Sequence, residues 1–366
     1  MEELFYQIAL TQVNLVGDKV ARNLLSQFGN ATAVFTAKER ELSAIDGMGQ
    51  GRIKAFTKAI DRKRIEKELK FIQQHQIQPL FINSPDYPKL LKECPDAPII
   101  LYYKGKGSLK GKKIIAIVGT RTNTDYGRQM VEELVTGFKD RKDVVIVSGL
   151  ASGIDAIAHK TALKNGLETI GVLGHGLDRI YPAQNRKLAS EMLSAGGLLT
   201  EYPTETTADK QNFPQRNRIV AGMAHVTVVV ETKEKGGSMI TAKLACSYNR
   251  EVAAFPGRSI DSHSAGCNYL IKTNIARLIT DAADLMEMMN WQPEEEQKHT
   301  VQRKLFTSLN REEQKVVACL NTEKEIHIDE LSLKTGLSDS KMAAILLSLE
   351  LEELVRSLPG KRYRLA

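Results

Sequence analysis

The chain has 366 residues, of which 42% are hydrophobic and 26% charged; this composition suits two or three folded domains and excludes a wholly disordered protein. The formal net charge of +7 mildly favours a polyanionic partner. We expect a cytoplasmic protein without a membrane partner, because no apolar run approaches a membrane span and the first residues lack the basic segment of a signal peptide. The four cysteines form no CxxC pair, so no metal, cofactor or disulfide framework is expected.

Residues 1–75 are polar and have helical periodicity, which predicts an N-terminal helical domain of the helix–hairpin–helix (SAM-like) type. In the segment IDGMGQGRIKAF (45–56), Gly47 and Gly49 fit the turn of such a hairpin. Two interpretations stay open: the glycines free backbone N–H groups that hold a phosphate, or they only separate two helices. Gly47 and Gly49 are therefore candidates for a secondary phosphate contact.

Residues 76–290 alternate short apolar runs with helical patterns. The runs are rich in β-branched residues and bounded by glycine or polar turns, as strands buried on both faces should be. They cover residues 114–118, 144–147, 169–173, 226–230 and 251–255. This alternation predicts an α/β domain with a Rossmann-like, doubly wound, mostly parallel sheet. Ligands of such folds bind beyond the carboxyl ends of the strands.

The turns that follow these strands carry glycine, hydroxyl and guanidinium groups. A glycine allows close backbone approach, a hydroxyl adds a donor, and an arginine offers a fork of donors to phosphate oxygens. The candidates are Gly119, Thr120, Arg121, Gly149, Ser152, Gly153, Gly236, Gly237 and Ser238. Several such turns at one edge of the sheet predict a phosphate-binding site.

A further loop is predicted at residues 210–218, where basic and aromatic residues occur together. Its candidate binding residues are Lys210, Phe213, Arg216, Asn217 and Arg218. Phosphate contacts beside an aromatic platform are typical of proteins that bind single-stranded nucleic acid. Phe213 either stacks on a base or lies in the core under the loop, and Arg218 is the better candidate for a structural salt bridge.

The motifs IAIVGTR, SGLASGIDAIAH, FPQRNRIVAGM and KGGSMITAKLA, in this order, resemble the DNA-processing protein A (DprA/Smf) family. The resemblance extends over nearly the whole chain. It implies a homodimeric, non-catalytic protein that binds and protects incoming single-stranded DNA and helps to load RecA in natural transformation and homologous recombination. It also implies that Arg121 grips phosphate, and that the 210–218 loop and the glycine-rich turns complete the site.

An enzyme is the alternative, namely a nucleotide phosphoribohydrolase on a related Rossmann-like fold. Such enzymes carry PGGxGT followed by a catalytic glutamate, whereas the corresponding segment here, KGGSMITAKLA, has no glutamate. Asp155 and His159, four residues apart, either form an acid–base pair or support a helix and pack in the core. We favour the structural interpretation, because no nucleophile accompanies them.

The polar segment WQPEEEQKHTVQ (291–302) is predicted to be a linker, and residues 303–366 a winged-helix domain. Three helical patterns are followed by two short strands around Pro359-Gly360, which would form the wing. Lys361, Arg362 and Arg364 in the wing are possible secondary DNA contacts. Before the linker, Leu285 and Met286 are either core residues or contacts between two copies of the chain.

Overall fold

The computed structural model describes residues 2–57, 60–108, 110–291, 309–322, 325–352, 354–358 and 361–365. The chain divides into two compact units, Met1–Trp291 and Gln292–Ala366. Trp291 is buried in the first unit, where its carbonyl accepts a 2.7 Å hydrogen bond from Nη1 of Arg141. The predicted linker therefore does not begin at Trp291, and its residues 292–302 lie outside the described part.

The first residues form helices, as their periodicity predicted. They are α1 (Glu2–Gln12), α2 (Asp18–Phe28), α3 (Ala31–Thr36), α4 (Glu39–Ser43), α5 (Gln50–Thr57) and α6 (Arg62–Gln74). Gly47, with φ of 84°, lies in the turn between α4 and α5, and its carbonyl accepts a hydrogen bond from Arg52. The helix–hairpin–helix type of this segment stays a prediction. Apolar residues of these helices, such as Ile8 and Leu24, share one core with the following sheet.

The centre of the first unit is a nine-stranded sheet. Its strands are β1 (Gln78–Phe81), β2 (Ile100–Gly105), β3 (Lys113–Val118), β4 (Val144–Ser148), β5 (Glu168–Val172), β6 (Gly196–Thr200), β7 (Val226–Val229), β8 (Glu251–Ala254) and β9 (Arg277–Leu278). The order is β1-β2-β6-β5-β4-β3-β7-β8-β9, and all pairs from β6 to β9 are parallel. The mostly parallel sheet is confirmed; β1, β2, β6 and β9 were not predicted.

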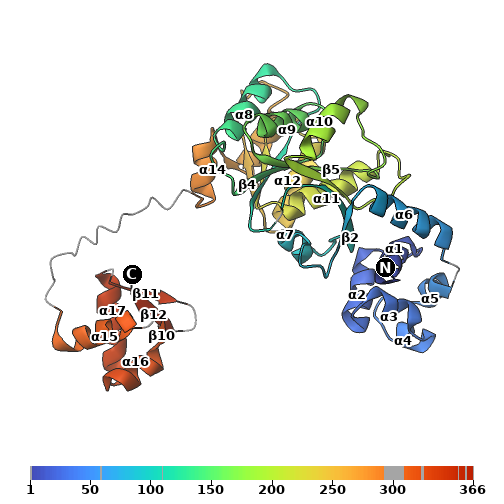
Figure 1. Cartoon of the computed structure of the whole chain (residues 1–366). Helices are drawn as coiled ribbons and strands as arrows, with labels where there is room; N and C mark the ends of the chain where they lie inside the picture. Colours follow the sequence, from blue (N-terminus) through green and yellow to red (C-terminus); the bar gives the residue numbers. More distant parts are fainter. Residues whose placement is uncertain are drawn as a thin grey trace. The chain divides into compact units, whose positions relative to one another are not determined.

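Helices cover both faces of this sheet (Figure 1). The face with α8 (Asp125–Thr136), α9 (Ile154–Lys164), α10 (Arg186–Met192) and α14 (Ala282–Met288) lies opposite the face with α11 (Asn212–Met223) and α12 (Gly237–Ser247). Successive side chains of a strand point to opposite faces. Accordingly Ile115 and Ile117 of β3 pack with α8 and α9, whereas Ile114 and Ala116 pack in the core that includes α11 and α12. The shorter elements α7 (Lys89–Glu93), η1 (Ala183–Asn185) and α13 (Ala265–Lys272) complete the unit.

Leu285 on α14 is 0% exposed and belongs to the core shared with α8. It therefore makes no contact with another copy of the chain, which corrects one of the two interpretations of this residue. Met286 is half-buried against the same core, and its Sδ lies 3.6 Å from Nη1 of Arg141.

The second unit has the helices and strands of a winged helix. They are α15 (Arg311–Thr322), β10 (Ile326–His327), α16 (Ile328–Thr335), α17 (Asp339–Leu351), β11 (Val355–Leu358) and β12 (Arg362–Leu365), with the sheet order β10-β12-β11. Of the predicted wing contacts, Lys361 and Arg364 are exposed, while Arg362 lies 2.7 Å from the carboxylate of Glu325. None of the described helices in either unit has the length and apolar character that crossing a membrane requires.

Candidate functional site

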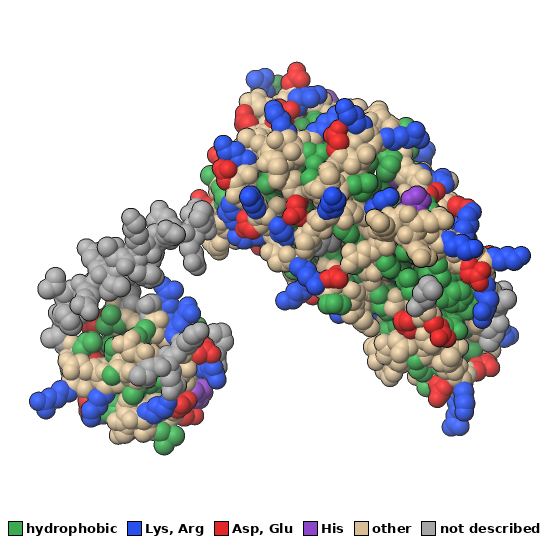
Figure 2. All heavy atoms as spheres, in the orientation of Figure 1, with side chains coloured by type: hydrophobic (Ala, Val, Ile, Leu, Met, Phe, Trp, Pro, Cys, Tyr) green, Lys and Arg blue, Asp and Glu red, His purple; other side chains and the backbone are tan. Residues whose placement is uncertain are grey.

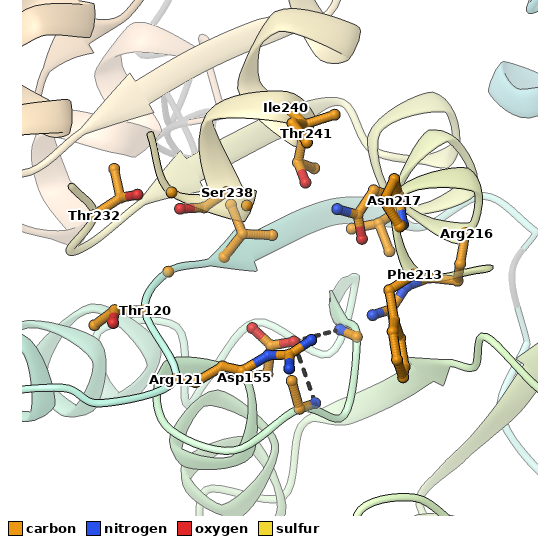
Figure 3. Close-up of a pocket in the computed structure, with 18 of the residues that line it drawn as sticks. Thr120, Arg121, Asp155, Phe213, Arg216, Asn217, Thr232, Ser238, Ile240 and Thr241 are labelled. Atoms are coloured by element: carbon orange, nitrogen blue, oxygen red, sulfur yellow. Dashed lines mark hydrogen bonds between the residues drawn. The ribbon is translucent and has the colours of Figure 1, made fainter. Parts of the chain in front are cut away.

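The strand order reverses at β3, because the chain leaves β3 toward β4 on one side and later returns to β7 on the other. Such a switch point opens a crevice beyond the carboxyl ends of the strands. A cavity of about 810 Å³ lies there (Figure 3), lined by the turns after β3, β4 and β7 and by the first residues of α11 and α12. We call it the main cavity.

The main cavity brings together most of the predicted binding residues. They are Gly119, Thr120, Arg121, Gly149, Lys210, Phe213, Arg216, Asn217, Gly236, Gly237 and Ser238. Ser152, Gly153 and Arg218 do not line it. On the face of the first unit shown in Figure 2, basic and acidic side chains are intermingled.

Arg121 and two aromatic rings form a row of planar groups at the main cavity. The Arg121 Cζ atom lies 5.3 Å from the centroid of the Phe213 ring, which in turn lies 5.8 Å from the Tyr181 ring at an interplanar angle of 36°. Figure 3 shows Arg121 and Phe213 reaching toward each other from the β3 turn and from α11. Arg121 is exposed and forms no ion pair with any described residue, and Tyr181 is 49% exposed. The row is thus accessible to a base and a phosphate.

Phe213 to Arg218 lie on α11, and the prediction that this segment is a loop is wrong. Pro214 is compatible with this helix because it falls in the first turn, where its missing N–H has no partner to lose. Residues two positions apart on a helix point about 200° apart, as follows from 3.6 residues per turn. Arg216 and Arg218 therefore face in nearly opposite directions.

Arg216 is only 4% exposed and lies under the main cavity, where its Nη1 donates to the carbonyl of Val172. A Cβ atom on Gly149 would overlap its guanidinium, so this glycine is required for the close approach. Asp155 accepts hydrogen bonds from the N–H groups of Gly149 (3.1 Å) and Ala151 (3.3 Å). Burial raises the pKa of Asp155, and the charge of Arg216 opposes this rise. Asp155 thus holds the β4 turn by its hydrogen bonds, and Arg216 packs against Gly149 of the same turn.

Arg218 faces the N-terminal helices. Its Nη2 lies 3.2 Å from Oδ2 of Asp18 on α2 and contacts the carboxylate of Glu201, while its Nη1 donates to the carbonyl of Asp96 at 2.7 Å. Burial raises the pKa of Glu201 to about 7. Arg218 is a structural salt-bridge residue that joins α2 to α11, and the structure does not bring it to the main cavity.

Glycines position Arg121 by letting two turns touch. Gly153 has φ of 77°, and a Cβ atom there would overlap the carbonyl of Thr120. The N–H of Ile154, the first residue of α9, donates to the same carbonyl at 3.2 Å. The turn that presents Arg121 is therefore held against the N-terminus of α9, so Gly153 acts on the site through the backbone.

His159 and Asp155 do not form an acid–base pair. His159 is fully buried, and its Nδ1 lies 2.6 Å from Oγ1 of Thr169. Burial lowers the pKa of His159 to about 3, so the ring is neutral at physiological pH. The interpretation of His159 as a packed, hydrogen-bonded core residue agrees with this geometry.

Some lining residues were missed by the sequence analysis, namely Tyr181, Thr232, Lys233, Lys235 and Thr241. The two lysines adjoin the predicted 236–238 turn, so their position next to that turn was an available signal. Tyr181 is held by His175, whose Nε2 accepts a 3.2 Å hydrogen bond from the Tyr181 N–H. No pattern in the sequence indicates that the β5 turn reaches Phe213 on α11.

The N-terminus of α12 also faces the main cavity. The first N–H groups of a helix have no partner within it, and Gly236 at the N-cap supplies no side-chain acceptor. Ser238 is buried, and its Oγ has no hydrogen-bond partner among the described residues. Together these groups form a set of donors suited to an anion.

Ser238→Ala is expected to weaken the binding of an anionic strand about threefold to tenfold, because the main cavity loses one hydroxyl donor. The free energy of unfolding should not fall, since the hydroxyl makes no hydrogen bond in the described structure. Fluorescence anisotropy and urea unfolding measure the two quantities. Ser264→Ala is the matched control, because Ser264 also has a buried Oγ without a partner but does not line the main cavity. Equal affinity in both variants would contradict a role for Ser238.

A doubly wound sheet with an anion-binding crevice at its switch point, followed by a winged helix, defines a class of two-unit Rossmann-like proteins. Within this class, comparison with known families points to a single family. The family model described as DNA recombination-mediator protein A matches residues 78–290, and the model of the DprA winged helix domain matches residues 306–361. The chain belongs to the DNA-processing protein A (DprA/Smf) family.

Individual relatives agree with this assignment. Protein Smf of Synechocystis sp. is 33% identical over an alignment that covers 99% of this chain and 98% of that protein. The X-ray structure of DNA processing protein A from Streptococcus pneumoniae has a TM-score of 0.68 at 32% identity, covering 77% of this chain and 97% of that one. The protein from Helicobacter pylori, whose structure is described for its single-stranded DNA binding mode, has a TM-score of 0.54 at 31% identity and covers 59% of this chain and 96% of that one.

Proposed function

We propose that this protein binds single-stranded DNA in the main cavity without sequence preference. The observation that carries the proposal is the row formed by exposed Arg121, half-buried Phe213 and exposed Tyr181 beside the N-terminus of α12, which has no side-chain cap. Arg121, Lys210 and the α12 N–H groups would contact phosphates, while the aromatic rings stack on bases. The single-stranded DNA binding described for the Helicobacter pylori relative supports this assignment.

The same cavity favours a single strand over a duplex. Stacking on Phe213 or Tyr181 requires a base whose face is free, and every base has such a face in a flexible strand. In a duplex the faces are covered by neighbouring base pairs. We therefore infer discrimination by stacking and flexibility, and binding that tolerates any sequence.

Membership of the family supports a place for this binding in the uptake and recombination of DNA. We propose that the protein protects incoming single strands and helps to load RecA on them in natural transformation and homologous recombination. A homodimer, the winged-helix contacts at Lys361, Arg362 and Arg364, and the hairpin contacts at Gly47 and Gly49 remain predictions that accompany this proposal.

A salt-series titration of the full chain with single-stranded and double-stranded DNA of equal length tests the binding proposal. We expect tighter binding of the single strand, with log Kd changing by about 0.7 per neutralised phosphate for each unit of log salt. Strands of different composition should bind alike. Equal affinity for duplex and single strand at every salt concentration would overturn the proposal.

A further inference from the structure

Ser152 and Gly153, which the sequence analysis assigned to phosphate binding, lie outside the main cavity but line a second one. This second cavity has a volume of about 320 Å³ and is bounded by α8, by the start of α9 and by η1. Its other lining residues include Asn123, Arg128, Glu132, Lys160, Gln184 and Asn185. None of the features proposed above for the main cavity uses it.

A third hollow of about 50 Å³ lies between the two cavities and shares lining residues with each of them. Arg121, Tyr181 and Phe213 line both this hollow and the main cavity. Ser152 lines both the hollow and the second cavity. The three hollows therefore adjoin one another along the surface, in the order main cavity, row of planar groups, Ser152 and second cavity.

The second cavity carries groups that suit a phosphate chain. Lys160 on α9 and Arg128 on α8 are exposed, and neither forms an ion pair with a described residue. Ser152 Oγ accepts a 2.7 Å hydrogen bond from Nε2 of Gln184, so its own hydroxyl proton stays free to donate. Glu132 is an exposed carboxylate in the same wall and reduces the attraction for an anion.

Building on the proposed function, we propose that a strand longer than the main cavity continues past Arg121 and across Ser152 into the second cavity. There Lys160 and Arg128 contact its phosphates. The stacked rings lie at the junction, where the strand passes from one cavity to the other. The binding site is thus a path with two phosphate-contacting ends, and its far end acts only on strands long enough to reach it.

The test compares a thymidine strand of about four nucleotides with one of about sixteen, the limits of the usual site size of a single-strand binding domain. Lys160→Ala and Arg128→Ala are each expected to reduce the affinity for the long strand about fivefold. Each should also reduce the slope of log Kd against log salt by about 0.7. The affinity of the short strand should stay at the wild-type value. Two variants on different helices guard against a local folding defect in either one.

The chain supplies two matched controls. Lys164→Ala removes the same charge from an exposed position one turn further along α9, outside the second cavity, and should bind both strands as the wild type does. Glu132→Gln removes the opposing carboxylate. It should increase the affinity for the long strand by about twofold to threefold and leave the affinity for the short strand unchanged.

Two results would overturn the path. One is a Lys160→Ala variant with the wild-type affinity and salt slope for the long strand. The other is a Lys160→Ala variant whose affinity falls equally for the long and the short strand. Failure of the proposed function looks different, because then Arg121→Ala would leave the binding of both strands unchanged. A loss of all binding in Arg121→Ala together with no effect of Lys160→Ala would refute the path and leave the main cavity in place.

Discussion

Arg121→Ala is expected to reduce the affinity for single-stranded DNA about 10-fold to 100-fold and to leave the free energy of unfolding unchanged. The variant loses a charge-assisted fork of hydrogen bonds to phosphate and the planar partner of Phe213. Stability is preserved because the guanidinium is exposed and pairs with no described acid. Fluorescence anisotropy with a labelled strand measures the loss, and the salt slope should fall by about 0.7.

Arg121→Lys separates charge from shape in this prediction. A lysine keeps the positive charge but loses the planar fork and the stacking surface, so we expect an affinity between those of the wild type and Arg121→Ala. Lys164→Ala controls for a general loss of charge from the first unit. Wild-type affinity in Arg121→Ala would show that the main cavity is not where the strand is gripped.

Arg216→Ala is expected to destabilise the first unit by about 1–3 kcal/mol, the usual cost of leaving a buried hydrogen-bond acceptor without its donor. Asp155 would stay buried without the nearby guanidinium, and the carbonyl of Val172 would lose its donor. Urea unfolding followed by circular dichroism measures the change. DNA binding by the folded fraction should fall less than in Arg121→Ala, because Arg216 lies beneath the surface of the main cavity.

Gly149→Ala tests the same contact from the other side. Its Cβ atom would overlap the guanidinium of Arg216, so this small substitution should destabilise the protein although it removes no charge. A variant Arg216→Ala with wild-type stability and lost DNA binding would reverse the assignment and make Arg216 a direct phosphate contact.

Five strands and most of the residues that line the main cavity could be predicted from the sequence, because short local patterns of residues indicate both. The β-branched runs mark strands buried on two faces, and parallel strands bring their carboxyl ends to one edge whatever the rest of the fold does. Gly119, Arg121 and Ser238 follow from this rule, whereas Lys210 was predicted from the basic and aromatic residues that follow it in the sequence. Strand β6 was not predicted because its segment starts with two glycines, and glycine is disfavoured in strands unless a neighbouring side chain occupies the place of its side chain. Here the Tyr103 ring occupies the place of a Cβ on Gly197.

What the sequence determined by itself is the class of fold and the set of groups at the edge of the sheet. Only the tertiary structure decided how two similar arginines are used. Arg216 donates to the carbonyl of Val172 beneath the β4 turn and Arg218 joins the N-terminal helices, because residues two apart on a helix point to opposite sides. It likewise decided that Ser152 lies in a second cavity and that Tyr181 reaches Phe213. Those positions depend on how separate turns pack against each other, and no local pattern encodes that distance.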